Sequence, residues 1–543
     1  MTNRITFVPS GRSLVVADGD TILDGALRCG ESLSAECGGR GACGRCLVRI
    51  VDGEVPEYRI LRREDGRPEV LACLTAVKGP LTILPLVGTE LPQLVSRDRN
   101  AGIQPLTAWA PWPLVLDPVH APGAADELGV ALDVGTTTLR LLLIRLADGT
   151  VVGEADAYNP QIARGADVIS RIVAAEKGLL PELASLIRQA VVEMVTAAAA
   201  AAEADVHRIR AYMVAGNVTM MHLLLGEDPS GIRRVPSEPR ALAFAPVPAE
   251  ALGWPGIGSA VVHSIPAAGG WVGGDIVAGV VRAGLSRASD TMTLYVDLGT
   301  NGEIAFGGAE FALACACSAG PAFEGTGIRC GMRADRGAID GARVSPETGA
   351  LEVSVIGGGR ARGVCGSGLI ALTHALFCAG WIDRGGRLTE ALPRDYRLEG
   401  QWGIAVALDT RRHVGLWERD LASLMRAKAA IFAGIRSLTT ALDQSAAPVD
   451  RVIVSGNFGR YLNLPAAIGI GLLPTLPFGR YSYVDNGSLE GAALALLSRE
   501  FLAELGSYLG RITYIDLSDL PGYMDEFVGA SFLPHTDPAV LGL

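Results

Sequence analysis

The sequence predicts a multidomain protein, with a small α+β domain at the N-terminus and a large, two-lobed α/β domain after it. Two observations predict this arrangement. Cysteines and glycines crowd into one loop, residues 37–46, inside a strand-rich segment that covers residues 1–87. Further along, one strand–turn–strand pattern occurs twice, 164 positions apart, among alanine-rich helical segments. Strands alternating with helices are typical of α/β domains, and a repeated unit indicates that one lobe duplicates the other.

Length and composition exclude several classes of function. The 543 residues are enough for about three domains, each with its own core. The net charge of −11 argues against a nucleic-acid partner, because Lys and Arg are not concentrated into a surface that could follow a phosphate backbone. Ten cysteines are too few in so long a chain for a disulfide framework.

Hydrophobic patterning predicts a cytoplasmic protein with no membrane partner. The N-terminus lacks the apolar core of a signal peptide. The long uncharged stretches, 251–274 and 461–479, contain prolines and glycines that interrupt a spanning helix. The alanine-rich segment around 197–202 is apolar only between Glu193 and Glu203, which is too short to span a bilayer.

Four cysteines follow the pattern of an iron–sulfur site. Cys37, Cys43 and Cys46 have the spacing C-x5-C-x2-C, and Cys73 follows after 26 more residues. Three thiolates on a glycine-rich loop plus one remote thiolate is how a [2Fe–2S] cluster is held. A zinc knuckle or clustered buried thiols are the alternatives, but zinc sites usually contain two C-x2–4-C pairs and only one occurs here. The spacing therefore favours a [2Fe–2S] cluster with these four cysteines as ligands.

Strand and helix signals around the cysteine loop complete the small domain. Thr21 is a typical N-cap for a short helix that ends near Leu27. Apolar segments rich in β-branched residues indicate strands at 5–8, 13–16, 47–51, 70–77 and 81–86. This order resembles the β-grasp fold of [2Fe–2S] ferredoxins. The five-residue gap between the first two cysteines is similar to the adrenodoxin-like branch.

Residues 88–128 differ in composition from both neighbours. Six prolines punctuate this segment without any periodicity, which is typical of a semi-rigid linker. Trp109 and Trp112 lie between the prolines and indicate that the linker docks on another part of the protein.

Each copy of the repeated pattern places an aspartate at a strand end and a polar turn after it. Asp133 precedes the turn Gly135–Thr137, and Asp297 precedes the turn Gly299–Asn301. Turn amides and Thr hydroxyls bind phosphate groups, and carboxylates can hold Mg²⁺ together with those phosphates. Ordinary hairpin turns are the alternative. Two copies in phase favour a nucleotide site, with a first lobe at about 129–290 and a second at about 291–543.

A third element adds to the two turns. Residues 451–459 form a β-branched strand that ends in Ser-Gly-Asn-x-Gly, and residues 485–488 precede a helix at 489–497. No G-x4-G-K-[ST] P-loop occurs. In this order, the three elements resemble the phosphate-1, phosphate-2 and adenosine motifs of the ASKHA (actin, sugar kinase, Hsp70) ATPases. That resemblance implies duplicated RNase H-like lobes and the binding of ATP with Mg²⁺.

A [2Fe–2S] domain joined to an ASKHA ATPase domain resembles the reductive activators of corrinoid-dependent methyltransferase systems. The resemblance covers nearly the whole chain and includes the segments 159–161, 165–172, 215–221, 273–275, 317–325, 366–369 and 418–435. Larger members of that family carry a further middle domain between linker and ATPase. We expect that domain to be absent here, because residues 88–128 are too few to form it, and this puts in doubt any dimer contact made through it.

The resemblance implies an ATP-dependent iron–sulfur reductase. Such an activator transfers one electron from its cluster to a corrinoid protein and restores cob(II)alamin to cob(I)alamin. The resemblance also implies a second partner, an upstream low-potential electron donor. A homodimer is one possible oligomeric state.

The resemblance also implies roles for individual residues. The residues expected to bind phosphate are Gly135, Thr136, Thr137, Gly299, Thr300 and Asn301. Those expected near adenosine are Gly456, Asn457 and Gly459. Asp133 and Asp297 would hold Mg²⁺, and Glu303 would position water, with Glu324 as the alternative. Asp275 fits a helix cap as well as a ligand.

Other functions and other residues fit less well. Activators of 2-hydroxyacyl-CoA dehydratases bridge a [4Fe–4S] cluster between subunits and have no ferredoxin domain, and a sugar kinase needs no cluster. A redox-sensing, chaperone-like binding protein is the non-enzymatic alternative. The cysteines expected to be buried thiols are Cys315, Cys317, Cys330, Cys365 and Cys378. We expect His222 at the edge of the core and His535 on the surface.

Overall fold

The chain forms two compact units in a computed structural model. One unit contains Met1–Leu94 with the short segment Pro160–Ala166, and the other contains Val95–Asn159 and Asp167–Leu543. Cys37, Cys43, Asn457 and Gly459, four of the expected site residues, lie outside the described part of the chain. The residues described are 2–8, 10–17, 19–29, 31, 33, 46–86, 116–120, 122–287, 291–398, 403–407, 414–441, 448–456 and 462–542.

The small unit is one mixed six-stranded sheet with a short helix. Its elements are β1 (Thr2–Phe7), β2 (Ser13–Ala17), α1 (Ile22–Arg28), β3 (Leu47–Asp52), β4 (Ile60–Glu64), β5 (Arg67–Leu71) and β6 (Leu81–Pro85). The strand order is β2-β1-β6-β3-β5-β4. Thr21 begins α1 as expected: its hydroxyl accepts a hydrogen bond from Asp24 N at 3.1 Å, and the Asp24 carboxylate accepts one from Thr21 N at 3.0 Å. Ile22, Phe7 and Ile83 are fully buried in the core of this unit.

Cys73 lies in a turn, although the sequence predicted a strand at 70–77. β5 ends at Leu71, and Ala72–Leu74 form a single 3-10 turn. The Thr75 hydroxyl donates to Leu71 O at 2.9 Å, which closes the turn, and Ala72 N donates to Cys46 O at 2.8 Å. These contacts bring Cys73 beside Cys46.

The first lobe of the large unit contains one six-stranded sheet, in the order β11-β12-β10-β7-β8-β9. Its strands are β7 (Leu128–Val134), β8 (Thr138–Arg145), β9 (Val151–Tyr158), β10 (Ile209–Gly216), β11 (Val247–Pro248) and β12 (Val261–Ser264). Its helices are α2 (Val168–Ala174), α3 (Leu180–Ala201), α4 (Val218–Leu225) and α5 (Gly274–Arg282).

The second lobe contains a six-stranded sheet in the order β22-β21-β13-β14-β15-β23, with two smaller sheets beside it. The strands are β13 (Thr293–Leu298), β14 (Gly302–Gly307), β15 (Ala312–Cys317), β16 (Ala338–Val344), β17 (Leu351–Val355), β18 (Gly363–Val364), β19 (Gly403–Ala407), β20 (Val414–Trp417), β21 (Arg451–Ser455), β22 (Tyr481–Tyr483) and β23 (Ile512–Tyr514). The later helices are α6 (Gly366–Cys378), α7 (Glu418–Thr440), α8 (Leu464–Gly469), α9 (Gly487–Leu497), α10 (Arg499–Leu509) and α11 (Tyr523–Ala530).

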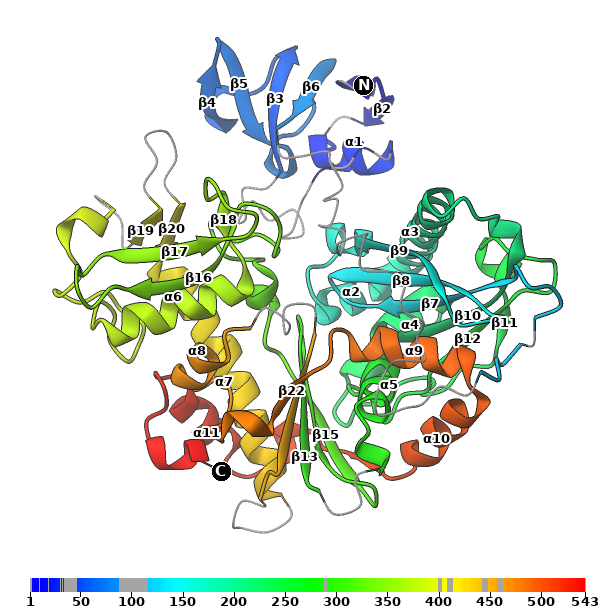
Figure 1. Ribbon diagram of the computed structural model, residues 1–543. Coiled ribbons are helices and arrows are strands. Elements are labelled where there is room, and N and C mark those ends of the chain that lie inside the picture. The colour runs from blue at the N-terminus through cyan, green and yellow to red at the C-terminus, as the bar shows by residue number, and fades with distance from the viewer. Residues whose placement is uncertain are drawn as a thin grey trace. The chain divides into compact units, whose positions relative to one another are not determined.

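The two large sheets share one topology, which confirms the predicted duplication. In each lobe three consecutive strands pair antiparallel, and two later strands then join in parallel beside the first of the three. The matching orders are β12-β10-β7-β8-β9 and β22-β21-β13-β14-β15. Figure 1 shows both sheets with their covering helices. Because the turns after β7 and β13 occupy equivalent places, the two Gly-Thr motifs have equivalent positions in their lobes.

One stretch in the described part of the chain, Val168–Ala201, is long and apolar enough by length and composition to cross a membrane. Gly178, at φ 89°, interrupts its helical conformation between α2 and α3. Leu183, Ile187 and Val191 on α3 are buried in the core of the first lobe. The apolar face of this helix therefore packs against its own sheet.

Helices α9 and α10 pack with the first lobe, although they follow the second lobe in the sequence. α9 contacts α5, β7 and β10, as Figure 1 shows, and α10 contacts α9 and α5. A Cβ on Gly491 would lie 2.6 Å from Ala278 O, so glycine is what permits the close approach of α9 to α5. These helices therefore pack on the first lobe although they lie within the predicted second lobe, about 291–543, because the first lobe covers their apolar faces.

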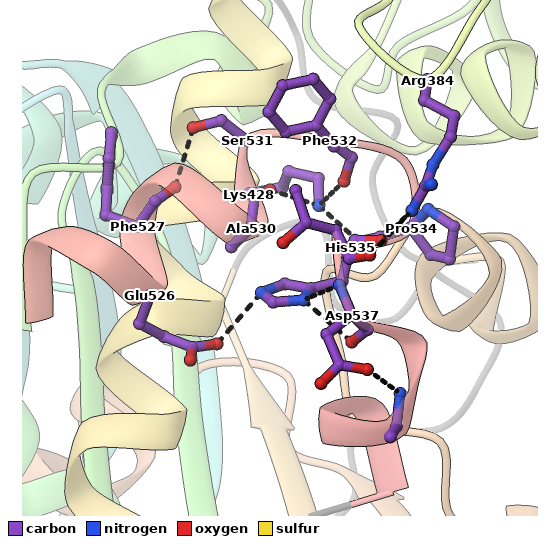
Figure 2. A network of polar contacts seen from close by, with 12 residues as sticks. Arg384, Lys428, Glu526, Phe527, Ala530, Ser531, Phe532, Pro534, His535 and Asp537 are labelled. Carbon is purple, nitrogen blue, oxygen red and sulfur yellow. Dashed lines mark hydrogen bonds and ion pairs between the residues drawn. The ribbon is translucent and has the colours of Figure 1, made fainter. Parts of the chain in front are cut away.

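A buried lysine fastens the C-terminal segment to α7. Lys428 is completely buried, and its ammonium donates to the carbonyl oxygens of Ala530, Phe532 and Pro534 at 2.5, 2.8 and 2.8 Å (Figure 2). Burial lowers the pKa of Lys428 to about 7. The three carbonyl acceptors oppose that shift, because each of them stabilises an N–H of the charged form. The contact also satisfies a carbonyl in the last turn of α11.

Candidate functional site

The two Gly-Thr turns lie together, one from each lobe. The hydroxyl oxygens of Thr137 and Thr300 are 2.6 Å apart, and both side chains are buried. Gly135 N donates to Thr138 O at 3.0 Å, and a Cβ on Gly135 would lie 2.6 Å from that oxygen. In the second turn, Gly299 N donates to Asn301 O at 3.2 Å. The structure thus brings together the residues predicted to bind phosphate.

Three side chains support the first turn, and none of them had a predicted role. Asn217 Nδ2 donates to Thr136 Oγ1 at 3.0 Å, and Asn159 Nδ2 donates to Gly135 O at 2.9 Å. Arg171, completely buried, donates to Thr136 O at 2.5 Å. All three belong to segments that carried the family resemblance, which was the signal available from sequence. Their contacts hold the turn in one conformation.

Asp133 is held at the end of β7 by residues from the start of α9. Asn486 Nδ2 donates to one carboxylate oxygen and the Ser488 hydroxyl to the other, each at 2.8 Å. Burial raises the pKa of Asp133, whereas these two hydrogen bonds lower it. Both oxygens are therefore oriented by partners more than 350 residues away in sequence.

Further carboxylates share this region. Burial and then repulsion from Asp133 raise the pKa of Asp275 to about 7, and burial raises the pKa of Asp297 to about 6. The pKa of Glu303 is raised well above its ordinary value, by burial first and then by Asp275 and Asp297. Asp275 Oδ1 also accepts from Ile276 N at 2.9 Å, so it contacts the first turn of α5 and faces the other carboxylates. The sequence left the role of Asp275 open, because its Gly-Gly-Asp context is equally typical of a helix cap.

This group of carboxylates fits a divalent cation that binds together with a nucleotide. Mutual repulsion at neutral pH is relieved by a cation. Within the described residues, no three His, Cys, Asp or Glu side chains are arranged to hold a metal alone. Mg²⁺ usually takes one or two carboxylates together with substrate phosphates and water. The donor set therefore suits Mg²⁺ beside phosphate turns better than an all-protein metal cage.

The carboxylates predict a specific pH dependence of stability without a cation. The folded pKa values of Asp275 and Asp297, about 7 and about 6, exceed the ordinary value of 3.8. The folded state then binds more protons, so stability present at about pH 4 is lost as the pH rises through these values. We expect Asp275→Asn to stabilise the protein more at pH 8 than at pH 5, by roughly 2–3 kcal/mol, and to raise the melting temperature more at pH 8 accordingly.

Thermal unfolding of the wild type and Asp275→Asn at the two pH values measures this difference. Asp148→Asn, at an exposed aspartate in the turn after β8, is the control. Its effect on stability should be the same at both pH values. An equal shift of Asp275→Asn at both pH values would contradict the interpretation.

Glu324 connects to the same turns from a different segment. Its Oε1 accepts from the Thr300 hydroxyl at 2.9 Å, and its Oε2 is buried with no hydrogen-bond partner among the described residues. Burial raises its pKa, and hydrogen bonds from Thr137 and Thr300 oppose that change. Glu324 therefore presents one free acceptor oxygen beside the phosphate turns.

The predicted adenosine strand lies beside the second phosphate strand. β21 pairs in parallel with β13, with Ser455 opposite Asp297. Gly456 has φ 111°, and a Cβ there would lie 2.6 Å from Leu298 O, so this position requires glycine. The Ser455 hydroxyl accepts from Gly487 N at 3.1 Å, which joins the end of β21 to the start of α9.

In the small unit, two of the four predicted cluster ligands are described and lie together. The sulfur atoms of Cys46 and Cys73 are 3.2 Å apart, far longer than the 2.05 Å, approximately, of a disulfide, and both residues are buried. The hydrogen bond between the Cys46 and Cys73 side chains lowers the pKa of Cys46 to about 7, against the effect of burial. Thiolates are the form that binds metal, so this pair fits two ligands of one iron.

Among the described residues, none of the remaining cysteines belongs to a group of three or more His, Cys, Asp or Glu side chains that could hold a metal ion. Cys315, Cys317 and Cys365 are buried, as expected, and burial raises the pKa of each thiol. Cys378 contradicts the prediction of a buried thiol: it is exposed at the end of α6, with its sulfur 3.4 Å from His374 Nε2. Cys330 is half-buried.

Two histidines singled out by sequence are both buried. His222 lies in the core with its Nδ1 at 2.8 Å from Val218 O. His535 was expected on the surface, but it is buried against Phe432, with its Nε2 at 3.2 Å from Glu526 Oε1 (Figure 2). The reason is the attachment of the C-terminal segment to α7, which no local pattern reveals.

Comparison with known proteins shows which family this chain resembles along most of its length. The chain is 30% identical over 422 residues to the corrinoid activation enzyme RamQ of Eubacterium limosum, a match that spans 74% of this chain and 69% of that protein. A solved structure of a reductive activator for corrinoid, iron-sulfur protein is 33% identical and superposes with a TM-score of 0.73, covering 98% of this chain and 99% of that one. The chain belongs to the family of corrinoid reductive activators.

Family profiles agree with this assignment along the sequence. Residues 5–78 match the 2Fe-2S iron-sulfur cluster binding domain, and 291–541 match the C-terminal domain of RACo, the ASKHA domain. The ferredoxin-like region is also 36% identical over 88 residues to DmpP, the reductase component of phenol 2-monooxygenase from Pseudomonas sp. strain CF600, covering 15% of this chain and 25% of that protein. The predicted fold class, a [2Fe–2S] ferredoxin-like domain followed by an ASKHA domain, is confirmed.

One expectation about this family is wrong. Residues 128–288 match the RACo middle region, which the sequence analysis expected to be absent. The matching residues lie after the linker and form the first lobe, so the shortness of residues 88–128 does not bear on the middle region. The family's middle region is therefore present.

Proposed function

We propose that this activator transfers one electron from its [2Fe–2S] cluster to a corrinoid protein of a methyltransferase system, restoring cob(II)alamin to cob(I)alamin with the hydrolysis of ATP. The observation that carries the proposal is that one chain combines paired cluster thiols with two facing phosphate turns and a group of buried carboxylates. A one-electron carrier alone needs no phosphate site, and an ASKHA kinase needs no cluster.

The small unit would supply the electron. Cys37, Cys43, Cys46 and Cys73 would hold the cluster, and the bound cluster supplies one electron at a time. Plant-type clusters have potentials near about −400 mV, and we expect the Co(II)/Co(I) couple to lie lower. An upstream low-potential donor would keep the carrier reduced, and all partners would meet it in the cytoplasm.

The large unit would make the transfer conditional on ATP. Gly135–Thr137 and Gly299–Asn301 would bind phosphates, Asp133 and Asp297 would hold Mg²⁺, and Gly456–Gly459 would lie along adenosine. Nucleotide would bind more tightly to one lobe arrangement than to the other, and that difference would set the affinity for the corrinoid protein. Hydrolysis would then release the reactivated partner.

Two carboxylates are candidates for orienting the attacking water. Burial, and then repulsion from Asp275 and Asp297, raises the pKa of Glu303, so a bound cation would favour its ionised form. Glu324 has one acceptor oxygen without a partner among the described residues, next to Thr300. We propose Glu303 for this role and Glu324 as the alternative. Glu303→Gln and Glu324→Gln, compared for turnover at saturating ATP, distinguish the two.

Replacing Cys46 with serine should abolish reduction of the corrinoid while leaving ATP hydrolysis in place. The reason is that the substitution removes a thiolate from the small unit alone. The measurement is the optical spectrum of cob(I)alamin, recorded with an anaerobic, cobalamin-loaded corrinoid protein, a chemical reductant and ATP. Cys29→Ser is the matched control, because that thiol lies at the edge of the core of the same unit and donates to Ala26 O at 3.4 Å.

The outcomes separate the two halves of the proposal. Reduction that proceeds equally without ATP would refute the role of the ATPase. Redox-dependent binding of the corrinoid protein without any electron transfer would favour the chaperone-like alternative.

A further inference from the structure

Arg333 crosses from the second lobe to a strand pair of the first lobe. Its Nη2 donates to Thr138 Oγ1 at 3.0 Å, its Nη1 lies 3.8 Å from Asp156 Oδ2, and its guanidinium stacks 3.5 Å from the ring centroid of Tyr158. Thr138 pairs with Tyr158, and Arg140 pairs with Asp156, in the antiparallel register of β8 and β9. One largely buried cation thus contacts three neighbouring side chains of the other lobe.

These contacts are directly connected to the first phosphate turn. Thr138 O accepts the hydrogen bond from Gly135 N that closes the turn, and its neighbour Thr137 contacts Thr300 of the second turn. A change in the position of the Thr138 side chain is therefore a change at the end of the turn. Arg333 therefore contacts Thr138, the residue that directly follows the first turn.

The segment that carries Arg333 also contacts the second turn. Glu324 accepts from Thr300, and the backbone between Glu324 and Arg333 is tightly folded. A Cβ on Gly331 would lie 1.9 Å from Gly325 O, and Met332 N donates to Val364 O at 2.9 Å. Residues 324–333 therefore form a compact bridge with a carboxylate at one turn and a guanidinium at the other.

We propose that Arg333 is a positioning residue that couples closure of the two lobes to occupation of the first phosphate turn. Asp156 offers the guanidinium one anionic partner on the first lobe. Phosphate groups in the turn provide a second anionic partner on the same lobe, so they strengthen the attraction of Arg333 to that lobe. The inference rests on the proposed function only for the identity of the anion.

Substitutions at Arg333 and Asp156 distinguish a coupling of lobe closure to nucleotide binding from a contact that only holds the two lobes together. Arg333→Ala should weaken the binding of a fluorescent ATP analogue at least about tenfold. Arg333→Lys should bind the analogue with an affinity between those of the wild type and Arg333→Ala, because lysine keeps the charge and loses the planar stacking surface. Asp156→Asn should leave the affinity unchanged or raise it, because the phosphate groups then compete with no carboxylate for Arg333. Arg336→Ala is the control, since Arg336 is an exposed arginine of the same loop.

Hydrogen exchange of β8 and β9 provides a second readout, which can be measured both without and with ATP. Arg333→Ala should speed exchange in both strands in the free protein, and ATP should slow exchange there in the wild type but not in this variant. Equal weakening by Arg333→Ala and Asp156→Asn would overturn the coupling, and so would unchanged exchange in Arg333→Ala. If the wild type bound no ATP analogue while Arg333→Ala still sped exchange, the proposed function would fail and the interlobe contact would stand.

Discussion

Asp133→Asn will reduce ATP hydrolysis at least about a hundredfold while the protein stays folded. Asp133 lies at the end of β7, oriented by Asn486 and Ser488, with Asp275 and Asp297 close enough to interact electrostatically. A cation at this position would neutralise charge that develops on the phosphates, and removal of one such electrostatic group typically costs two to three orders of magnitude, roughly, in turnover. Asparagine keeps the shape of the side chain and removes its charge.

Turnover and Mg²⁺ dependence measure this effect. The variant should require more Mg²⁺ for half-maximal activity, because one anionic ligand is gone. Asp148→Asn, at the exposed turn after β8, should retain wild-type turnover and Mg²⁺ dependence. Hydrolysis by Asp133→Asn within about threefold of wild type would remove Asp133 from the proposed metal site.

Lys428→Met will destabilise the large unit by about 3 kcal/mol or more. The substitution fills most of the space but leaves the carbonyls of Ala530, Phe532 and Pro534 without their donor (Figure 2). A buried polar group left unsatisfied costs about 1–3 kcal/mol, and three carbonyls lose their partner together. Arg384 still contacts the carbonyls of Leu533 and His535, so we expect the segment to loosen before the whole lobe unfolds.

Denaturant unfolding and hydrogen exchange of residues 523–542 test this expectation together. Exchange should accelerate first in α11 and the residues after it. The matched control is Lys177→Met, because Lys177 is an exposed lysine in the same unit and its replacement should change stability by less than about 0.5 kcal/mol. Similar stabilities for the two variants would show that the ammonium contributes little.

Local patterns in the sequence were sufficient for the parts of the protein that depend on spacing. The cysteine pattern ending at Cys46, the cap at Thr21, and the two aspartate–turn motifs at Asp133 and Asp297 each occupy a few consecutive residues. Backbone geometry alone determines what such short segments can bind or begin, so their chemistry is visible without a fold. The duplication followed from the repeat and is confirmed by the shared topology of the two sheets.

Contacts between distant segments required the tertiary structure. Asn486 and Ser488 reach Asp133 because α9 packs against the first lobe, and Arg333 reaches Thr138 only because the lobes face each other. His535 is buried because the C-terminal segment attaches to α7 through Lys428.

Spacing along the chain thus predicts the kinds of site in this protein, a thiolate cluster site and two phosphate-binding turns. The folded structure selects the side chains that orient those turns and the charges that face each other, because burial and packing choose partners that no spacing along the chain specifies.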